Sequence, residues 1–276
     1  MPLFRVTLAY DGTDFLGWQL QRPGGGRTVQ GVIEEALGRL ARGARVAVSS
    51  AGRTDRGVHA LGQVASFDLP REVPAGELQR ALNGLLPSDV RVLDAAPAAP
   101  GFHPRRSAVA KLYRYELDCG GVQLPQRRRF AGFAPGPLDE GAVRAAAALY
   151  VGRHDFASLA SAGGSVRTTV RTVARSEARL EGAVLVYEAE ADGFLRKMVR
   201  SMVGGLIAAG RGALTPAELA RALEAREVDD AEEALLVGAD GHDLEQILQG
   251  HGAGGLVLLR AYPSIARREG KRRARG

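Results

Sequence analysis

The segment AGRTDRGVHA, residues 51–60, gathers side chains that could do chemistry. Asp55 stands between Arg53 and Arg56, and two flanking glycines let a ligand approach the backbone closely. A carboxylate beside guanidinium groups stays ionised at neutral pH, which suits a nucleophile or a base but not a proton donor. An aspartate in a glycine-flanked connection more often caps local N–H groups. The neighbouring arginines favour a catalytic carboxylate over that plain turn residue.

A second group, KLYRY at residues 111–115, lies in a stretch that alternates like a strand. In a strand, Lys111, Tyr113 and Tyr115 point to one face. Basic residues interleaved with tyrosines predict contacts with phosphates and stacking on bases, worth about 1–3 kcal/mol per stacked base. Aromatic packing across strands explains the pattern equally well.

Arg196 and Arg200 form a third group. They are four residues apart at the margin of the apolar face of a predicted helix over residues 194–210. An arginine at such a margin usually extends to solvent. Arg200 could instead reach into a cleft and pair with a carboxylate.

The composition favours an anionic partner. The 276 residues carry a formal net charge of +6, and only three of the 37 basic residues are lysine. Arginine makes planar, bidentate contacts with phosphate and stacks on bases, so nucleic acid is the first expectation. A biased genome would produce the same arginine content.

Other classes of protein are disfavoured. Cys119 is the single cysteine, which excludes an intrachain disulfide, and no Cys/His spacing typical of zinc occurs, so we expect no metal. No apolar run is long enough to cross a bilayer, and the N-terminus lacks a signal-peptide pattern, so we expect no membrane partner. A reducing cytoplasm is the expected location.

Hydrophobic periodicity predicts the elements that position these groups. The first half follows the order β-α-β-β-α-β, the split unit of ferredoxin-like folds. Its expected elements lie at residues 3–10, 28–40, 45–50, 62–69, 76–87 and 89–96. The Asp55 segment therefore connects the two middle strands of this half.

The second half repeats that order, with an inserted helix that opens on a capping box of Thr215 and Glu218 around Pro216. Its expected elements lie at residues 107–118, 138–152, 166–180, 183–191, 194–210 and 254–262. The sequence thus predicts an α+β fold of two halves with mainly antiparallel sheets. Helices on the outer faces would leave the other faces free as stacking platforms, with Tyr113 on one of them.

The expected domains follow from these elements. An N-terminal half spans residues 1–98, a C-terminal half spans residues 105–264, and a basic tail that we expect to be disordered spans residues 265–276. The tail could add salt-sensitive affinity for RNA.

Ordered motifs over nearly the whole chain resemble the TruA family of tRNA pseudouridine synthases. The GRTD-x-GVHA motif is highly specific, and the helix with MVR supports it. The matching stretches are YDGTDFLGWQLQ, TVQ, GRTDRGVHA, QVASF, GFHPRRSAVAKLYRY, HDFASL, RTV, FLRKMVRSMVGGL and GGLVLL.

The resemblance implies the pseudouridine synthase fold and the isomerisation of uridine to pseudouridine at positions 38, 39 and 40 of the tRNA anticodon stem-loop. It also implies a homodimer without a metal or organic cofactor. Asp55 matches the essential aspartate of the family, and Arg200 matches the arginine that pairs with it. Tyr113 matches the tyrosine that stacks on the target base. Arg53 matches the arginine linked to base flipping and active-site order.

Further residues are expected to bind the substrate: Lys111, Arg56, His59 and Arg196. Two positions depart from the family pattern, because Arg56 stands where alanine is usual and Lys197 where histidine is common. Neither position carries one of the implied catalytic roles. Arg56 could add a phosphate contact.

The chemistry of the implied reaction explains the charged segment around Asp55. A carboxylate can attack C1′ of the ribose, as in retaining glycosidases, or remove the C2′ proton to give a glycal, and the sequence does not choose between these routes. The base must be flipped out and water excluded, so we expect an enclosed pocket between the two halves. Two alternatives remain open: a non-catalytic RNA-binding protein, and a ribonuclease that uses His59, His103 and Lys111.

Overall fold

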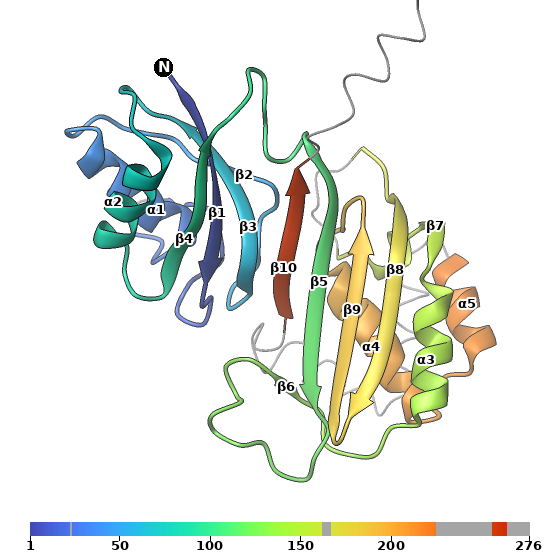
Figure 1. Cartoon of the computed structure of the whole chain (residues 1–276). Helices are drawn as coiled ribbons and strands as arrows, with labels where there is room; N and C mark the ends of the chain where they lie inside the picture. Colours follow the sequence, from blue (N-terminus) through green and yellow to red (C-terminus); the bar gives the residue numbers. More distant parts are fainter. Residues whose placement is uncertain (23, 162–166, 225–255, 264–276) are drawn as a thin grey trace, which may run out of the picture. The chain divides into compact units, whose positions relative to one another are not determined.

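The computed structural model describes residues 1–22, 24–161, 167–224 and 256–263 (Figure 1). The chain forms two compact units. The first comprises Met1–Asp55, Ala60–Lys111 and Leu258–Gly276, and the second comprises Arg56–His59 and Leu112–Val257. The predicted tail at residues 265–276 lies outside the described residues.

The first unit has the predicted β-α-β-β-α-β order. Strand β1 pairs antiparallel with both β3 and β4, and β2 pairs with β3, so the strand order is β4-β1-β3. Its elements are β1 (Leu3–Tyr10), α1 (Val29–Leu40), β2 (Ser49–Ser50), β3 (His59–Asp68), α2 (Ala75–Leu85) and β4 (Val90–Pro97).

Buried and partly buried residues alternate strictly along β1, so every second side chain of this strand packs into the core of the unit. The buried residues of the strand are Phe4, Val6, Leu8 and Tyr10. Each fully buried apolar side chain of this size contributes about 1.5–3 kcal/mol. Figure 1 shows α1 and α2 over one side of this sheet, and Thr28 caps α1 as predicted by accepting a hydrogen bond from the N–H of Gly31 at 3.2 Å.

The strand predicted at residues 45–50 is largely absent, since only Ser49–Ser50 pair as β2. Side chains of α1 occupy the backbone groups that a neighbouring strand would need. The N–H of Val48 donates to Glu34 Oε1 at 3.1 Å, and the carbonyl of Val48 accepts from Gln30 Nε2 at 3.4 Å.

The second unit carries the predicted order with two short strands added, and the strand order in its sheet is β5-β9-β8-β7. Strand β6 pairs parallel with β5, while β8 pairs antiparallel with β7 and β9. Its first elements are β5 (Ala108–Asp118), β6 (Gly132–Phe133), α3 (Glu140–Leu149), β7 (Gly152–Asp155) and the 3₁₀ turn η1 (Ala157–Leu159). The remaining elements of this unit are β8 (Val170–Glu181), β9 (Val184–Ala191), α4 (Met198–Gly210) and α5 (Pro216–Glu224). Strand β10 (Leu256–Pro263) belongs mostly to the first unit, which takes Leu258 onward.

Two local predictions in the second unit are confirmed. The β8–β9 hairpin turns at Gly182, whose φ of +62° is the left-handed region that favours glycine. The capping box opens α5, because the N–H of Thr215 donates to Glu218 Oε2 at 2.8 Å and the N–H of Glu218 donates to Thr215 Oγ1 at 3.3 Å.

Helix α4 begins four residues later than predicted, at Met198. Lys197 precedes it with φ +59°, a conformation that is uncommon for a residue with a side chain. The carbonyl of Arg196 accepts a hydrogen bond from the N–H of Ser161 at 3.1 Å, so it is bonded outside the helix. The prediction that placed Arg196 on one helix with Arg200 is therefore wrong.

Helix α4 forms the centre of the second core, since eleven of its thirteen residues are buried. The hydroxyl of Tyr150 donates to the carbonyl of Met202 at 3.0 Å, and the Tyr187 hydroxyl bonds Ser176 Oγ at 2.9 Å. Burial raises the pKa of both tyrosines well above the ordinary value. None of the described helices is long and apolar enough to cross a membrane.

Candidate active site

Gly52 fixes the start of the segment that carries Asp55. Its carbonyl accepts hydrogen bonds from Gln63 Nε2 at 2.7 Å and from Ser50 Oγ at 3.1 Å. Gln63 is fully buried in β3, and Ser50 ends β2. Two strands of the first unit therefore hold the backbone three residues before Asp55.

Thr54 fixes the same segment directly beside Asp55. Its carbonyl accepts from the N–H of Trp18 at 2.9 Å, and its Oγ1 bonds the hydroxyl of Tyr10 at 2.8 Å. Tyr10 and Trp18 are buried, and burial raises the pKa of Tyr10 to about 12. The hydroxyl of Tyr10 is therefore protonated at any physiological pH.

These contacts make the segment alternate between buried and exposed residues. Gly52 and Thr54 are buried, whereas Arg53, Asp55 and Arg56 are exposed. Because the backbone that leads into Asp55 is held at Gly52 and Thr54, the Asp55 carboxylate is presented from a fixed base. Such preorganisation is what a catalytic group requires.

Lys111 lies against the same segment. A Cβ built on Gly52 would lie 3.1 Å from Lys111 Nζ, so the ammonium approaches the α-carbon of that glycine closely. Lys111, Gly52 and Asp55 all belong to the first unit.

His59 is buried in the second unit and is 3 % exposed. Its Nε2 bonds the carbonyl of Arg129 at 2.7 Å, and its ring lies 4.8 Å from the ring of Phe130. These contacts tie the end of the GRTDRGVHA motif to residues 129–130. A role of His59 in substrate binding stays a prediction.

Tyr113 and Tyr115 share the side of β5 that faces the helices. Tyr113 is 9 % exposed and meets Phe194 edge-on with ring centroids 5.0 Å apart. Burial raises the pKa of Tyr115, and the nearby charge of Arg200 in the first turn of α4 opposes that rise. The second unit thus brings Tyr113, Tyr115 and Arg200 to one side of its sheet.

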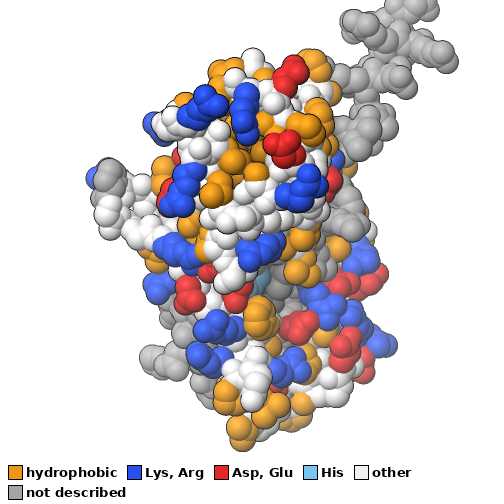
Figure 2. Space-filling view, turned by 60° about the vertical axis from the view of Figure 1, so that its left-hand side comes forward, with side chains coloured by type: hydrophobic (Ala, Val, Ile, Leu, Met, Phe, Trp, Pro, Cys, Tyr) orange, Lys and Arg blue, Asp and Glu red, His pale blue; other side chains and the backbone are white. Residues whose placement is uncertain are grey.

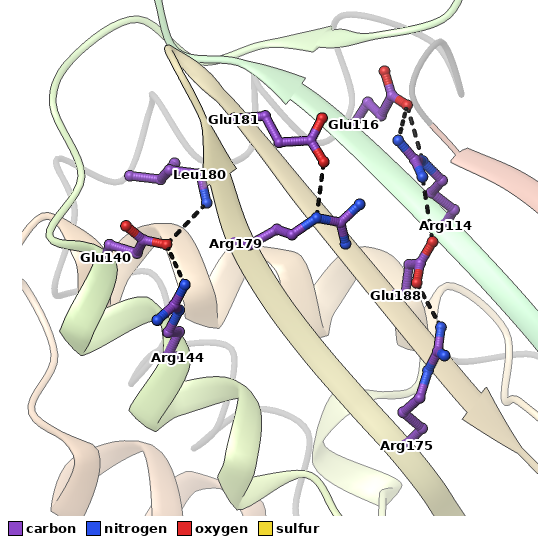
Figure 3. A network of polar contacts seen from close by, with 9 residues as sticks. All are labelled: Arg114, Glu116, Glu140, Arg144, Arg175, Arg179, Leu180, Glu181 and Glu188. Atoms are coloured by element: carbon purple, nitrogen blue, oxygen red, sulfur yellow. Dashed lines mark hydrogen bonds and ion pairs between the residues drawn. The ribbon is translucent and has the colours of Figure 1, made fainter.

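The other side of this sheet carries ion pairs (Figure 3). Arg114 contacts Glu116 at 2.8 Å and Glu188 of the adjacent strand at 3.3 Å, and Arg175 also pairs with Glu188. The prediction that Tyr113 lies on a free face is therefore wrong. Residues alternate along β5, so Arg114 and Glu116 take the uncovered face and the tyrosines take the covered one.

Basic side chains are spread over the surface that Figure 2 draws. On the described residues of that face, Lys and Arg stand singly or in small groups between hydrophobic and acidic side chains. The described part of the chain holds no group of three His, Cys, Asp or Glu residues that could bind a metal ion.

Sequence reasoning missed the residues that hold the Asp55 segment, of which all but Ser50 are buried: Tyr10, Trp18, Ser50 and Gln63. Tyr10 and Trp18 lie in the motif YDGTDFLGW, and Gln63 begins the motif QVASF. The motifs therefore marked these residues, but the sequence did not indicate what they do. Only the folded chain shows that these distant positions meet at one segment.

Comparison with known proteins identifies the family. The family model described as tRNA pseudouridine synthase matches residues 7–105 and 146–240. The tRNA pseudouridine synthase A of Latilactobacillus sakei subsp. sakei (strain 23K) is 46 % identical over 214 residues, which cover 76 % of this chain and 84 % of the relative. That of Solidesulfovibrio magneticus is 48 % identical over 231 residues, which cover 82 % of this chain and 84 % of the relative.

The chain therefore belongs to the tRNA pseudouridine synthase family, a family of isomerases. The resemblance noted in the sequence is confirmed. The matched ranges contain Arg53, Asp55 and Arg200, while Lys111 and Tyr113 lie between them. A chain from the crystal structure of a Cbf5-Nop10-Gar1 complex covers 74 % of this chain and 45 % of its own length, with 11 % identity and a TM-score of 0.32, too low to indicate a shared fold.

The substitution Tyr10→Phe tests whether the Tyr10 hydroxyl holds the segment that carries Asp55. It removes the hydroxyl that bonds Thr54 Oγ1, and losing a buried hydrogen bond lowers the free energy of unfolding by about 1–2 kcal/mol. We expect faster amide hydrogen exchange at residues 53–56, measured by mass spectrometry. The ratio of the exchange rates in the variant and the wild type should be the same at pH 6 and pH 9, because the pKa of about 12 keeps the Tyr10 hydroxyl protonated at both.

Tyr150→Phe is the matched control, because it removes a buried tyrosine hydroxyl that bonds the carbonyl of Met202 in the other unit. It should lower stability similarly without changing exchange at residues 53–56. Equal exchange in the two variants would show that Tyr10 does not hold this segment.

Proposed function

We propose that this protein isomerises uridine to pseudouridine at positions 38, 39 and 40 of the tRNA anticodon stem-loop, with Asp55 acting on the ribose. One observation carries the proposal. Asp55 is exposed, while Gly52 and Thr54 beside it are held by four hydrogen bonds from buried or strand-borne groups. Family membership supplies the reaction class.

The reaction breaks the bond between C1′ and N1 of the uridine and forms a bond between C1′ and C5. Asp55 either attacks C1′ as a nucleophile or removes the C2′ proton. In the first route the bond between the carboxylate and C1′ breaks when C5 attacks C1′, and in the second the proton returns to C2′ when C5 bonds to C1′. The detached uracil turns and bonds through C5, whose hydrogen leaves as a proton while N1 gains one. Reactant and product have the same formula, so the reaction needs no external reductant, oxidant or group donor, and we propose that no metal or organic cofactor takes part.

Other side chains serve the same nucleotide in this proposal. Tyr113 stacks on the target base, and its edge contact with Phe194 holds its ring in place. Arg200 offsets the negative charge of the reacting carboxylate, and Arg53 assists base flipping. Lys111, Arg56, His59 and Arg196 are further candidates for substrate binding.

Asp55→Asn keeps the size of the side chain and removes its charge. We expect tritium release from tRNA labelled at C5 of uracil to fall by at least about a thousandfold, because the group that reacts with the sugar is lost. Affinity for tRNA, measured by filter binding, should stay within about threefold, since phosphate contacts dominate it.

Asp68→Asn is the matched control, an exposed aspartate at the end of β3 that should leave turnover unchanged. Substantial tritium release by the Asp55→Asn variant would refute the catalytic assignment. The wild-type assay also separates the alternatives: a nuclease shortens the tRNA, a pure binding protein releases no tritium, and a synthase keeps length and mass.

Arg200→Ala tests the second charged group. We expect turnover to fall by about a hundredfold or more, because the reacting carboxylate loses its partner charge. Arg144→Ala removes an exposed arginine that pairs with Glu140 on α3 and should leave turnover unchanged. Near-normal rates for Arg200→Ala would contradict its proposed role.

We also propose a homodimer that works in the cytoplasm. The dimer rests on the resemblance to the family, and the location rests on the tRNA substrate and the single cysteine. Sedimentation equilibrium should give twice the chain mass of 29.2 kDa, and a monomer mass would refute the dimer. Recovery of the protein in the membrane fraction of lysed cells would refute the location.

A further inference from the structure

The side chain of Lys111 occupies the space that the missing side chain of Gly52 leaves open. A Cβ at Gly52 would lie 3.1 Å from Nζ, 3.6 Å from Cε and 3.9 Å from Cδ of Lys111. The last three atoms of the lysine therefore run along one α-carbon. A distance of 3.1 Å is tighter than nine in ten real Cβ contacts, so a side chain at this position would push the end of Lys111 away by a few tenths of an ångström.

This placement differs from that of a phosphate-binding lysine. Such a residue carries its charge on a long, flexible stem that points to solvent. Lys111 is half-buried, and its ammonium lies against the segment that carries Asp55. The carbonyl of the same glycine is already held by Gln63 and Ser50.

The contact also links two functional stretches of the sequence. Lys111 lies two residues before Tyr113 in β5, and Gly52 lies three residues before Asp55. A displacement of the ammonium would therefore act on the backbone that positions Asp55. Misplacing a reacting group by about 1 Å can cost a hundredfold in rate.

We propose that Lys111 is a positioning residue, whose ammonium packs on Gly52 and holds the Asp55 segment in its active geometry. This inference rests on the proposed function. It replaces the expectation that Lys111 contacts an RNA phosphate. Because the space beside Gly52 suits a slender ammonium, the larger guanidinium of arginine does not substitute for it.

Four variants test the proposal by tritium release under steady-state conditions: Lys111→Arg, Lys111→Met, Gly52→Ala and the double variant Gly52→Ala/Lys111→Met. We expect each single variant to lower kcat by about tenfold to a hundredfold, with KM for tRNA within about twofold. The double variant should be no slower than the slower single variant, because alanine at 52 acts by displacing an ammonium that Lys111→Met has already removed.

A phosphate contact predicts a different pattern. Lys111→Met would then raise KM and reduce the salt slope of tRNA binding by about one, Lys111→Arg would behave like the wild type, and Gly52→Ala would have no effect. That pattern overturns the proposal. If Gly52→Ala does not fold, judged by its melting temperature, the contrast between Lys111→Arg and Lys111→Met still decides.

Two controls complete the experiment. Arg179→Met removes an exposed arginine paired with Glu181 on β8 and should change neither kcat nor KM. A wild-type protein that releases no tritium would refute the proposed function itself. An active wild type with normal Lys111→Arg and Gly52→Ala variants would refute only the positioning role.

Discussion

Hydrogen bonds to Gly52 and Thr54 hold the segment that carries Asp55 in one conformation. Gln63 and Tyr10 supply two of these bonds from buried positions on β3 and β1. Leaving such buried groups unpaired costs about 1–3 kcal/mol each, so the segment cannot relax without a penalty. An exposed carboxylate on a fixed backbone loses little entropy when it meets a substrate. The first core thus sets the geometry on which the proposed chemistry relies.

The two sides of the sheet in the second unit differ, because one is covered by a helix and the other carries paired charges. One side packs on α4 and carries Tyr113 and Tyr115, with Arg200 entering from the first turn of that helix. The other side neutralises its own charges through pairs such as Arg114 with Glu188. A surface whose charges are already paired attracts phosphates weakly. The residues that the family resemblance marks as functional in this unit therefore share the helix-covered side.

Periodicity and capping rules predicted most elements, because those signals are local. Thr28 caps α1 and the Thr215 box opens α5 as expected. The errors came from contacts between distant residues. The N–H of Val48 donates to the Glu34 side chain and not to a neighbouring strand, and the carbonyl of Arg196 accepts from the N–H of Ser161 and not from a residue of α4. No local pattern reveals such partners.

The sequence predicted which residue of the candidate site could react, but not which residues hold that residue in place. Residue types and spacing singled out Asp55, whereas the roles of Tyr10 and Gln63 follow only from the fold. A structure of the Asp55→Asn variant bound to unmodified tRNA tests the central claim most directly. We predict that the side chain of residue 55 lies within about 3.5 Å of C1′ or C2′ of an everted uridine. A structure in which that side chain contacts no ribose would contradict the account.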